Sequence, residues 1–266
     1  MKGFPTGALL QGRYRLGREL GRGPVSITYL AHDHQQGDEV AIKALALAPA
    51  ERARARHEVV AAWAVVHRNI VAVRGCFEAG ECACVAMDYV DGPDLGTRIL
   101  SGPLSAEEAA AVGRGVALGL QAAHRLGILH RHVVPSNILI GAEVRASLSD
   151  FGSAGFGAPR GNDRSRDLLA PEVAAGQPAD ARTDLYGLGL CLFISLTGQL
   201  PARPASDRSP TASADGFRPS WFCPTVPPWL DDAVAQATAV LPADRFSSAG
   251  RFAEALAQAR SAALGR

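Results

Sequence analysis

The residues best suited to chemistry in this chain are one lysine at the end of an apolar run and two histidines in a short loop. Lys43 follows Val40-Ala41-Ile42, and the only other lysine is Lys2, so 25 of the 27 basic residues are arginine. A chain that uses arginine so widely is expected to keep lysine where a compact ammonium group serves better than a guanidinium fork. The loop begins at His130, and the imidazole of His132 is a competent base near neutral pH.

The loop itself resembles a known motif. His130-Arg131-His132-Val133-Val134-Pro135-Ser136-Asn137 is similar to the catalytic loop of protein kinases, whose pattern is H-R-D-x-K-x-x-N. The first two residues, the proline and Asn137 fit that pattern. His132 stands where the family keeps its catalytic Asp, and Val134 stands where its serine/threonine kinases keep a phosphate-contacting Lys. The resemblance implies a kinase fold whose chemistry is altered at its centre.

Three upstream motifs follow the family's order. Gly21 and Gly23 open a segment that resembles the G-x-G-x-x-G-x-V loop over the ATP phosphates, with Ser26 in place of the third glycine. In isolation that segment fits a plain β-turn better. The strand ending in Lys43 matches V-A-I-K, which implies phosphate contact, although an edge-strand lysine is the alternative. Glu58 would pair with Lys43 from a helix over residues 51–66, or it is a solvated helix glutamate.

The resemblance also implies residues around a nucleotide base. The segment Asp88-Tyr89-Val90-Asp91-Gly92-Pro93 resembles the hinge, where backbone groups, here those of Asp88 and Val90, meet the adenine edge. Met87 would be the gatekeeper, and the carboxylate of Asp94 would reach the ribose. A mostly apolar slot with few polar anchors is typical of such sites, and each residue taken singly also fits ordinary core. The slot would consist of Leu20, Thr28, Ala41 and Leu139.

Two oxygen-bearing side chains complete the implied site. Asp150 begins Asp150-Phe151-Gly152, and it follows Asn137 at the distance that the family uses. In the family these two residues hold magnesium. Two oxygen ligands together with phosphate oxygens suit Mg²⁺, which keeps much of its water. The implied cofactors are therefore ATP and Mg²⁺.

Later matches to the family are structural. Glu172, in Ala170-Pro171-Glu172, would form a buried ion pair with Arg245. Asp184 would hold the backbone of the catalytic loop. The segment between Gly152 and Ala170 has the glycine and arginine content of a mobile activation loop, with Ser165 where serine/threonine kinases place a Thr.

The side chains named above must be positioned by strands and helices, and the hydrophobic pattern predicts such strands and helices. Short alternating runs predict an antiparallel meander, and the pattern turns helical after residue 105. Ser105 and Glu108 form a capping box for a helix that runs to about Arg125. We expect an α+β, protein-kinase-like two-lobed fold, with an N-lobe over residues 10–90 (five strands and one helix) and a mainly helical C-lobe over residues 91–262. The expected strands are 13–20, 26–32, 39–45, 71–77, 82–87, 138–140 and 146–149, and the last helices are 229–239 and 248–264.

Composition excludes several classes of protein. The chain has 266 residues, of which 47% are hydrophobic, and its net charge is +1, so no strong field favours nucleic acid or an anionic membrane. The longest apolar run, Leu185–Leu196, is too short to span a bilayer and is expected to be a buried helix. The N-terminus has no signal-peptide core. Five cysteines in a long chain indicate a reduced, cytoplasmic protein, and Cys82-x-Cys84 is expected to be two buried strand thiols rather than a metal site.

Three functions remain open. The resemblance covers roughly residues 10–262 and is closest to bacterial eukaryotic-like serine/threonine kinases. The leading hypothesis is a pseudokinase that binds ATP and Mg²⁺ and signals to protein partners of unknown identity. The second is a slow or unusual serine/threonine kinase with His132 as its base, and the third is a nucleotide-free scaffold, suggested by Ser26. His132 is otherwise a satisfied loop histidine without a proton role.

Overall fold

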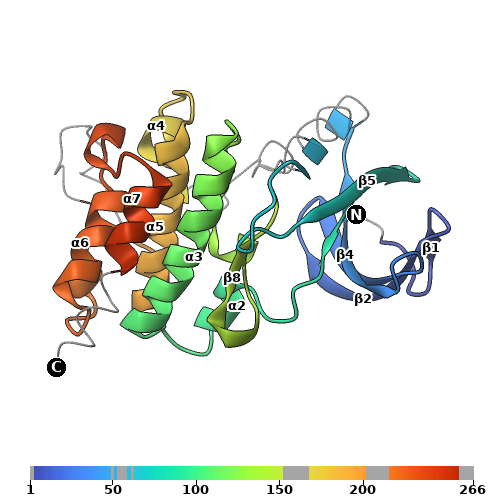
Figure 1. The fold of residues 1–266 in the computed structure, drawn as a ribbon, viewed down its shortest axis with the longest axis horizontal. Coiled ribbons are helices and arrows are strands. Elements are labelled where there is room, and N and C mark those ends of the chain that lie inside the picture. The colour runs from blue at the N-terminus through green and yellow to red at the C-terminus, as the bar shows by residue number, and fades with distance from the viewer. Residues whose placement is uncertain are drawn as a thin grey trace.

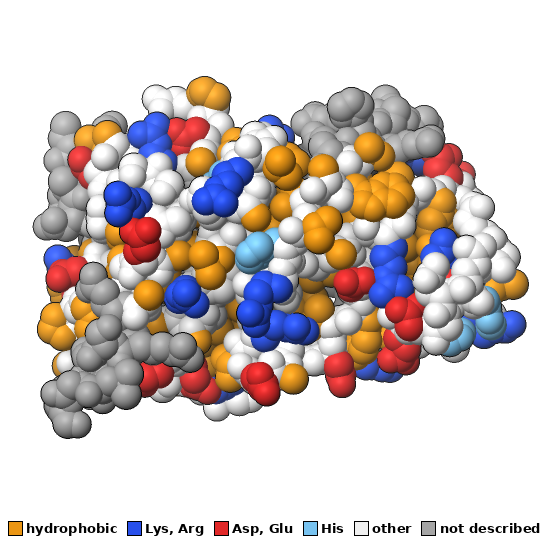
Figure 2. All heavy atoms as spheres, in the orientation of Figure 1, with side chains coloured by type: hydrophobic (Ala, Val, Ile, Leu, Met, Phe, Trp, Pro, Cys, Tyr) orange, Lys and Arg blue, Asp and Glu red, His pale blue; other side chains and the backbone are white. Residues whose placement is uncertain are grey.

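The computed structural model describes residues 3–48, 51–52, 59–60, 63–151, 168–201 and 216–257. A curled sheet forms one end of the molecule and a group of helices the other, and the chain passes from the sheet to the helices after β6 (Figure 1). The expected α+β architecture with a β-rich first part and a helical second part is confirmed. Basic and acidic side chains are interspersed on the face in Figure 2, in keeping with the low net charge.

Within the described residues, the sheet has six antiparallel strands in the order β1-β2-β3-β4-β6-β5. The expectation of five strands is wrong by one, because β1 is only two residues long and shows no alternation that a sequence pattern could reveal. Two further strands, β7 (Ile138–Ile140) and β8 (Ala146–Leu148), form a separate hairpin. The sheet strands are β1 (Leu9–Leu10), β2 (Tyr14–Arg22), β3 (Ser26–Asp33), β4 (Asp38–Ala46), β5 (Val73–Ala79) and β6 (Cys82–Asp88).

Both faces of the sheet are largely buried, and each face belongs to a different apolar cluster. Ile27, Ile42 and Cys84 belong to a closed apolar cluster on one face. Ala41, Leu45 and other alternate residues belong to a second cluster on the opposite face, which also carries Lys43. Side chains alternate between faces along a strand. Val71 and Leu139, which lie outside the sheet, belong to or pack against the second cluster, so this second face is the one that meets the rest of the molecule. Cys82 and Cys84 are both buried in β6, as expected, and burial raises the pKa of the Cys84 thiol to about 12.

The helices form the second part. The capping box of α3 is present, with Ser105 as N-cap and Glu108 bonded back to it. Residues 183–196 of α5 are buried on every side, so the apolar run forms the centre of the helical core. Among the described residues, no helix combines the length and the apolarity needed to cross a membrane. The helices are α2 (Leu95–Ile99), α3 (Ala106–Arg125), α4 (Pro171–Ala174), α5 (Ala181–Thr197), α6 (Pro228–Ala237) and α7 (Ala249–Ala257), with 3₁₀ turns at Pro135–Asn137, Ala142–Val144, Pro219–Trp221 and Pro242–Asp244.

A buried ion pair fixes the helical part. Both terminal nitrogens of Arg245 donate to Glu172 at 2.8 Å, and the two side chains are 0% and 6% exposed. The guanidinium also lies 4.7 Å from the ring centre of Tyr186. The predicted pairing of Glu172 with Arg245 is confirmed.

The two parts of the molecule are joined through Asn69. Its amide nitrogen donates to the carbonyl of Ala146 at 2.7 Å, and its own carbonyl accepts from the backbone of Leu148 at 2.9 Å. Two glycines of α3 make room for it, because a Cβ atom at Gly115 or Gly119 would lie 2.9 Å from Asn69 atoms. The loop after the expected helix is therefore anchored to α3 and β8.

Several expectations fall outside the described residues. They concern Glu58, most of the segment from Gly152 to Ala170 with Ser165, residues 202–215, and the part of the last predicted helix beyond residue 257.

Candidate functional site

The loop from His130 to Asn137 is held in place by Asp184, a residue of α5. The carboxylate of Asp184 accepts the backbone N–H of His130 at 2.9 Å and that of Arg131 at 2.6 Å. His124 contacts the same carboxylate at 2.8 Å. Asp184 is buried, and Arg131 has the left-handed backbone (φ 64°) that this sharp bend requires. The predicted role of Asp184 in holding the loop backbone is confirmed.

The ring of His130 ties the loop to the strand end that carries Asp150. Nε2 of His130 donates to the carbonyl of Ser149 at 2.7 Å, and Nδ1 accepts the backbone N–H of His132 at 3.2 Å. Since one nitrogen donates and the other accepts, the imidazole is neutral, and burial lowers the pKa of His130 accordingly. The ring also packs edge-on against Phe151, with the centroids 4.6 Å apart.

Close packing of the loop on α5 depends on Gly187. A Cβ atom at this position would lie 2.8 Å from the carbonyl oxygen of Val133. No larger residue fits here without moving the loop, so the backbone of α5 supports the residue between His132 and Val134 directly.

His132 and Asn137 are brought together at the centre of the site. The amide nitrogen of Asn137 donates to the carbonyl of His132 at 3.0 Å and lies 3.3 Å from its Nδ1. A carbonyl only accepts, so the amide nitrogen must face His132 and the amide oxygen must face away. Nδ1 of His132 therefore accepts, and the ring proton resides on Nε2.

The electrostatic surroundings of His132 agree with this assignment. Burial is the largest influence and lowers the pKa of the imidazole below its usual value, and His130 and Lys43 lower it further. Asp150 acts in the opposite direction. At neutral pH His132 is therefore an uncharged group that presents an N–H.

Lys43 and Asp150 share one space although 107 residues separate them in sequence. The ammonium group of Lys43 donates to a carboxylate oxygen of Asp150, and the two side chains are 16% and 15% exposed. Asp150 has a left-handed backbone (φ 68°), which turns its side chain off the end of the β8 region. The structure thus unites the predicted phosphate contact and one predicted metal ligand, while Glu58 lies outside the described residues.

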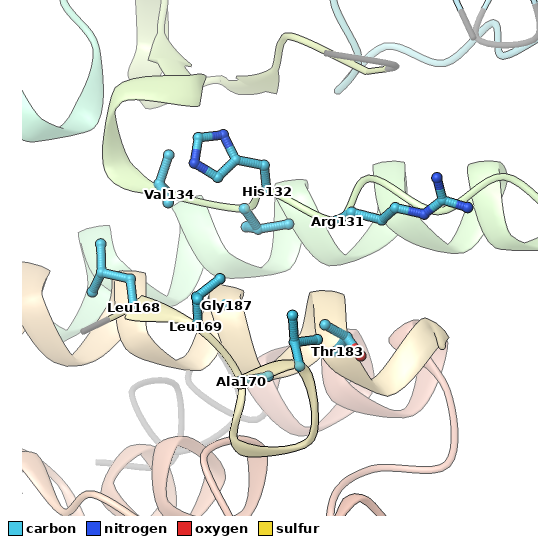
Figure 3. Close-up of a pocket in the computed structure, with 10 residues that line it drawn as sticks. Arg131, His132, Val134, Leu168, Leu169, Ala170, Thr183 and Gly187 are labelled. Carbon is cyan, nitrogen blue, oxygen red and sulfur yellow. The ribbon is translucent and has the colours of Figure 1, made fainter. Parts of the chain in front are cut away.

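Val134 leaves an apolar gap where the family pattern has a lysine. Figure 3 shows the side chains of His132 and Val134 next to each other, with Arg131 pointing away from both. A cavity of about 30 Å³ separates the loop from Leu168 and Ala170. Such a volume has room for a water molecule but not for a substrate side chain. Arg131 also lines this cavity, but its side chain points away from Val134, so its guanidinium group does not take the place of the missing lysine (Figure 3).

The predicted slot for the base largely comes together. Ala41 and Met87 are paired across β4 and β6, and both are buried in the second sheet cluster. Leu20, Val90 and Leu139 pack against that cluster from three separate segments. Thr28 is paired with Lys43 on β4 and with Gly21 on β2. Paired residues of antiparallel strands point to the same face, so Thr28 lies on the face of the sheet that carries Lys43 and Ala41.

The segment expected to be the hinge is fixed at Asp88 and at Gly92. The backbone N–H of Asp88 donates to the carbonyl of Ala72 at 2.9 Å, and its carboxylate accepts from Arg74 at 2.6 Å. Gly92 has φ 155°, and a Cβ atom there would lie 2.0 Å from the carbonyl oxygen of Ile140. Only glycine permits this approach to β7.

Two predicted residues have local structural partners. Both carboxylate oxygens of Asp94 accept from Thr97, at 3.0 and 2.7 Å, so Asp94 is the N-cap of α2. The backbone N–H of Gly23 donates to the carbonyl of Ser26 at 2.8 Å and closes a tight hairpin after β2. A contact of Asp94 with a ribose, and of Gly21 and Gly23 with phosphates, stays a prediction.

Sequence analysis missed two residues that position this site. Arg74 bridges Asp88 and Asp38, which fixes the start of the hinge segment. His124 supports Asp184 from α3. Neither carries a local signal, because each acts through a partner that is distant in the chain.

Comparison with known proteins gives consistent matches. The family model described as protein kinase domain matches residues 14–222. The serine/threonine-protein kinase PknJ of Mycobacterium tuberculosis is 35% identical over 275 residues, which cover 96% of this chain and 46% of that protein. Serine/threonine-protein kinase PknB of Mycolicibacterium smegmatis is 35% identical, with 91% of this chain and 42% of that protein covered. The chain spans less than half the length of these relatives.

A solved structure is also similar to this chain. The kinase domain of Mycobacterium tuberculosis PknI, crystallised as a cysteine-to-alanine mutant, matches with a TM-score of 0.77 and 31% sequence identity. The match covers 97% of this chain and 99% of that one.

Proposed function

Because this chain belongs to the protein kinase domain family, among the bacterial eukaryotic-like serine/threonine kinases, we propose that it is a pseudokinase module. It binds ATP with Mg²⁺ between its lobes and acts on protein partners through the shape of that bound form. We assign residues 10–90 to the N-lobe and residues 91–262 to the C-lobe. We further propose a cytoplasmic location, which the free thiols of the described cysteines support.

The nucleotide half of the proposal rests on the convergence of Lys43, Asn137 and Asp150. Lys43 is paired with Asp150, so a cation and an anion stand together beside the apolar slot. Both N–H groups of the Asn137 amide face His132, and no described residue donates to its oxygen. That oxygen and the carboxylate of Asp150 form the donor set that Mg²⁺ prefers. When bound, Mg²⁺ would neutralise charge on the phosphates.

The loss of transfer chemistry rests on one observation, the hydrogen bond from Asn137 to Nδ1 of His132. A group that activates an acceptor hydroxyl must offer a lone pair to its proton. The lone pair of His132 is already used, and the nitrogen that remains carries a hydrogen. The position that in active kinases accepts a hydrogen bond therefore donates one here.

Val134 adds to this loss. It is 8% exposed and brings no charge to the space in which a lysine would stabilise the transferring phosphoryl group. A positioned general base contributes roughly 10²- to 10⁴-fold, and one preorganised electrostatic donor contributes about 10²- to 10³-fold. The two groups act as a unit, so these factors need not multiply. Even the smaller loss makes protein phosphorylation slow.

A second candidate is a slow or atypical serine/threonine kinase. Its support is that relatives at 34–35% identity are named serine/threonine-protein kinases. It requires the ring of His132 to give up its bond to Asn137 and to present a bare nitrogen to the acceptor. Transfer of the γ-phosphate from labelled ATP to the protein or to a generic substrate, lost in Asp150→Ala, would favour this candidate.

Thermal unfolding with increasing Mg·ATP tests the nucleotide half. A ligand that binds only the folded state stabilises it by RT ln(1 + [L]/Kd), so the unfolding temperature should keep rising with the logarithm of the ligand concentration. Mg²⁺ alone and ATP with a chelator serve as controls. If Mg·ATP produces no rise, the module is a nucleotide-free scaffold instead.

A further inference from the structure

One ring nitrogen of His132 is not used by the loop that holds this residue. The backbone N–H of His132 donates to His130, its carbonyl accepts from Asn137, and Nδ1 accepts from the same amide. Nε2 is the atom that remains, and it carries a hydrogen in this neutral ring and would also carry one in a protonated ring. Among the described residues, no atom accepts that hydrogen. His132 therefore offers a hydrogen-bond donor to a ligand.

The ring of His132 is near the pair formed by Lys43 and Asp150. Lys43 lowers the pKa of this imidazole and Asp150 raises it, and such charge effects fall off with distance. In Figure 3 the ring lies on the other side of the loop from Ala170 and Thr183. His132 is half-buried, so a ligand beside Lys43 and Asp150 can reach its ring.

A series of contacts leads from the base slot to His132. Lys43 belongs to the face of β4 that forms one wall of the slot, and its ammonium group is paired with Asp150. Ser149, which precedes Asp150, donates from its backbone N–H to the carbonyl of Asn137 at 2.8 Å. Asn137 in turn contacts His132. A nucleoside triphosphate extends from its base in one direction, so its terminal phosphate is the one that comes nearest to His132.

The charge at this end of the site favours a phosphate. The carboxylate that the family pattern has at position 132 would repel a phosphate, whereas the N–H of His132 attracts one. Hydrogen bonds to a charged acceptor are stronger than those between neutral groups. Val134 brings no charge and Arg131 points away. Among the described residues of the loop, the N–H of His132 is therefore the group left to contact the phosphate that ATP has and ADP lacks.

We propose that His132 is a specificity-determining residue, which donates a hydrogen bond from Nε2 to the terminal phosphate of Mg·ATP and makes the module bind a nucleoside triphosphate more tightly than a diphosphate. This inference rests on the proposed nucleotide site. It gives the histidine a function of its own at a position where proton transfer is lost. The bound form that partner proteins meet then depends on whether the nucleotide still has its third phosphate.

Isothermal titration with Mg·ATP and with Mg·ADP tests the role of His132. The quantity compared is the Kd for Mg·ADP divided by the Kd for Mg·ATP. A hydrogen bond to a charged group corresponds to about tenfold in affinity or more. His132→Ala should therefore lower this ratio about tenfold, by weakening the binding of Mg·ATP and leaving that of Mg·ADP unchanged. The same ratio in His132→Ala and in the parent chain would overturn the proposal.

Further variants separate the donor from the shape of the ring. The side-chain amide of His132→Gln supplies an N–H near the place of Nε2, so its ratio should lie between those of the parent and His132→Ala. His132→Asp brings an anion and should have the smallest ratio of the series. His34→Ala is the matched control, because it removes an exposed histidine just after β3 and should leave the ratio unchanged. A ratio in His132→Asp equal to that of the parent also contradicts the proposal.

Imidazole NMR of the parent chain tests the contact directly, and it decides the matter if the variants do not fold. Mg·ATP should move the Nε2 hydrogen signal of His132 downfield and slow its exchange with water, and Mg·ADP should leave both near their values in the free protein. An equal response to the two nucleotides would overturn the proposal. If the parent binds neither nucleotide, the proposed nucleotide site fails, whereas equal affinities for both contradict only the role of His132.

Discussion

Asn137 directs both hydrogens of its amide at His132, one to the carbonyl oxygen at 3.0 Å and one to Nδ1 at 3.3 Å. This relationship fixes two things at once. It leaves the amide oxygen of Asn137 for a cation, and it leaves His132 with a hydrogen on its outer nitrogen. One side-chain pair thus favours retention of a metal-bound phosphate and disfavours activation of an acceptor hydroxyl.

Restoring the two family residues should restore phosphate transfer. The double variant His132→Asp/Val134→Lys supplies an acceptor for the hydroxyl proton and a positive charge near the phosphoryl group. Since a general base alone contributes roughly 10²- to 10⁴-fold, we expect the rate to rise at least a hundredfold. Single-turnover transfer from γ-labelled ATP measures it.

The gain must depend on the metal site. Adding Asp150→Ala to the double variant should return the rate to that of the parent chain. A parent that already transfers phosphate as fast as the double variant would show that His132 does not impair the chemistry.

Lys43 should carry much of the affinity for the triphosphate. A hydrogen bond to a charged group contributes about 1.5–3 kcal/mol, so Lys43→Ala should weaken Mg·ATP binding by roughly tenfold to a hundredfold. Isothermal titration of both proteins measures the change. Lys2→Ala is the matched control, because it removes the only other lysine. Equal affinities of the two variants would remove Lys43 from the site.

Breaking the ion pair between Glu172 of α4 and Arg245 should destabilise the fold strongly. Glu172→Ala leaves Arg245 buried without its partner, and loss of one member of a buried pair costs about 3–5 kcal/mol. Urea unfolding measures the free energy. Glu254→Ala breaks the exposed pair with Arg251, whose side chains are 67% and 70% exposed, and should change it by no more than about 1 kcal/mol. Similar losses in both variants would contradict the structural role of Glu172.

Acid should destabilise the protein through His130. Burial lowers the pKa of this imidazole in the folded chain, whereas in the unfolded chain it titrates near 6.5. As the pH falls below that value, the unfolded state takes up the proton first, so the free energy of unfolding falls until the folded pKa is reached. Imidazole NMR should show His130 with its hydrogen on Nε2 and titrating below pH 6.5. Titration at or above that pH would contradict the two hydrogen bonds of the ring.

Sequence analysis predicted elements whose signals are local. The capping box at Ser105 predicted the start of α3, because the two residues that form it lie within one turn. The run through Leu185 predicted a buried helix, because apolar residues on all sides exclude a solvated one. β1 gave no signal, since two residues show no period, and α2 was missed because it has only five residues.

For the site as well, some residues were predicted from the sequence and some contacts were not. Resemblance identified Glu172, Arg245 and Asp184, and the structure brings each to its partner. The hydrogen bonds between His132 and Asn137 could not be predicted from the sequence, because a family pattern supplies no geometry for a histidine at an aspartate position. The pairing of Lys43 with Asp150 depends on how the sheet closes on β8, which no local pattern encodes.

The central claim is that the cleft holds ATP and leaves it intact, and equilibrium dialysis with γ-labelled ATP and Mg²⁺ tests it most directly. After dialysis, the protein side is precipitated with acid, and the label is followed. The account predicts an excess of label with the protein that acid releases entirely as ATP. No excess, or label that remains attached to the precipitated protein, would contradict it.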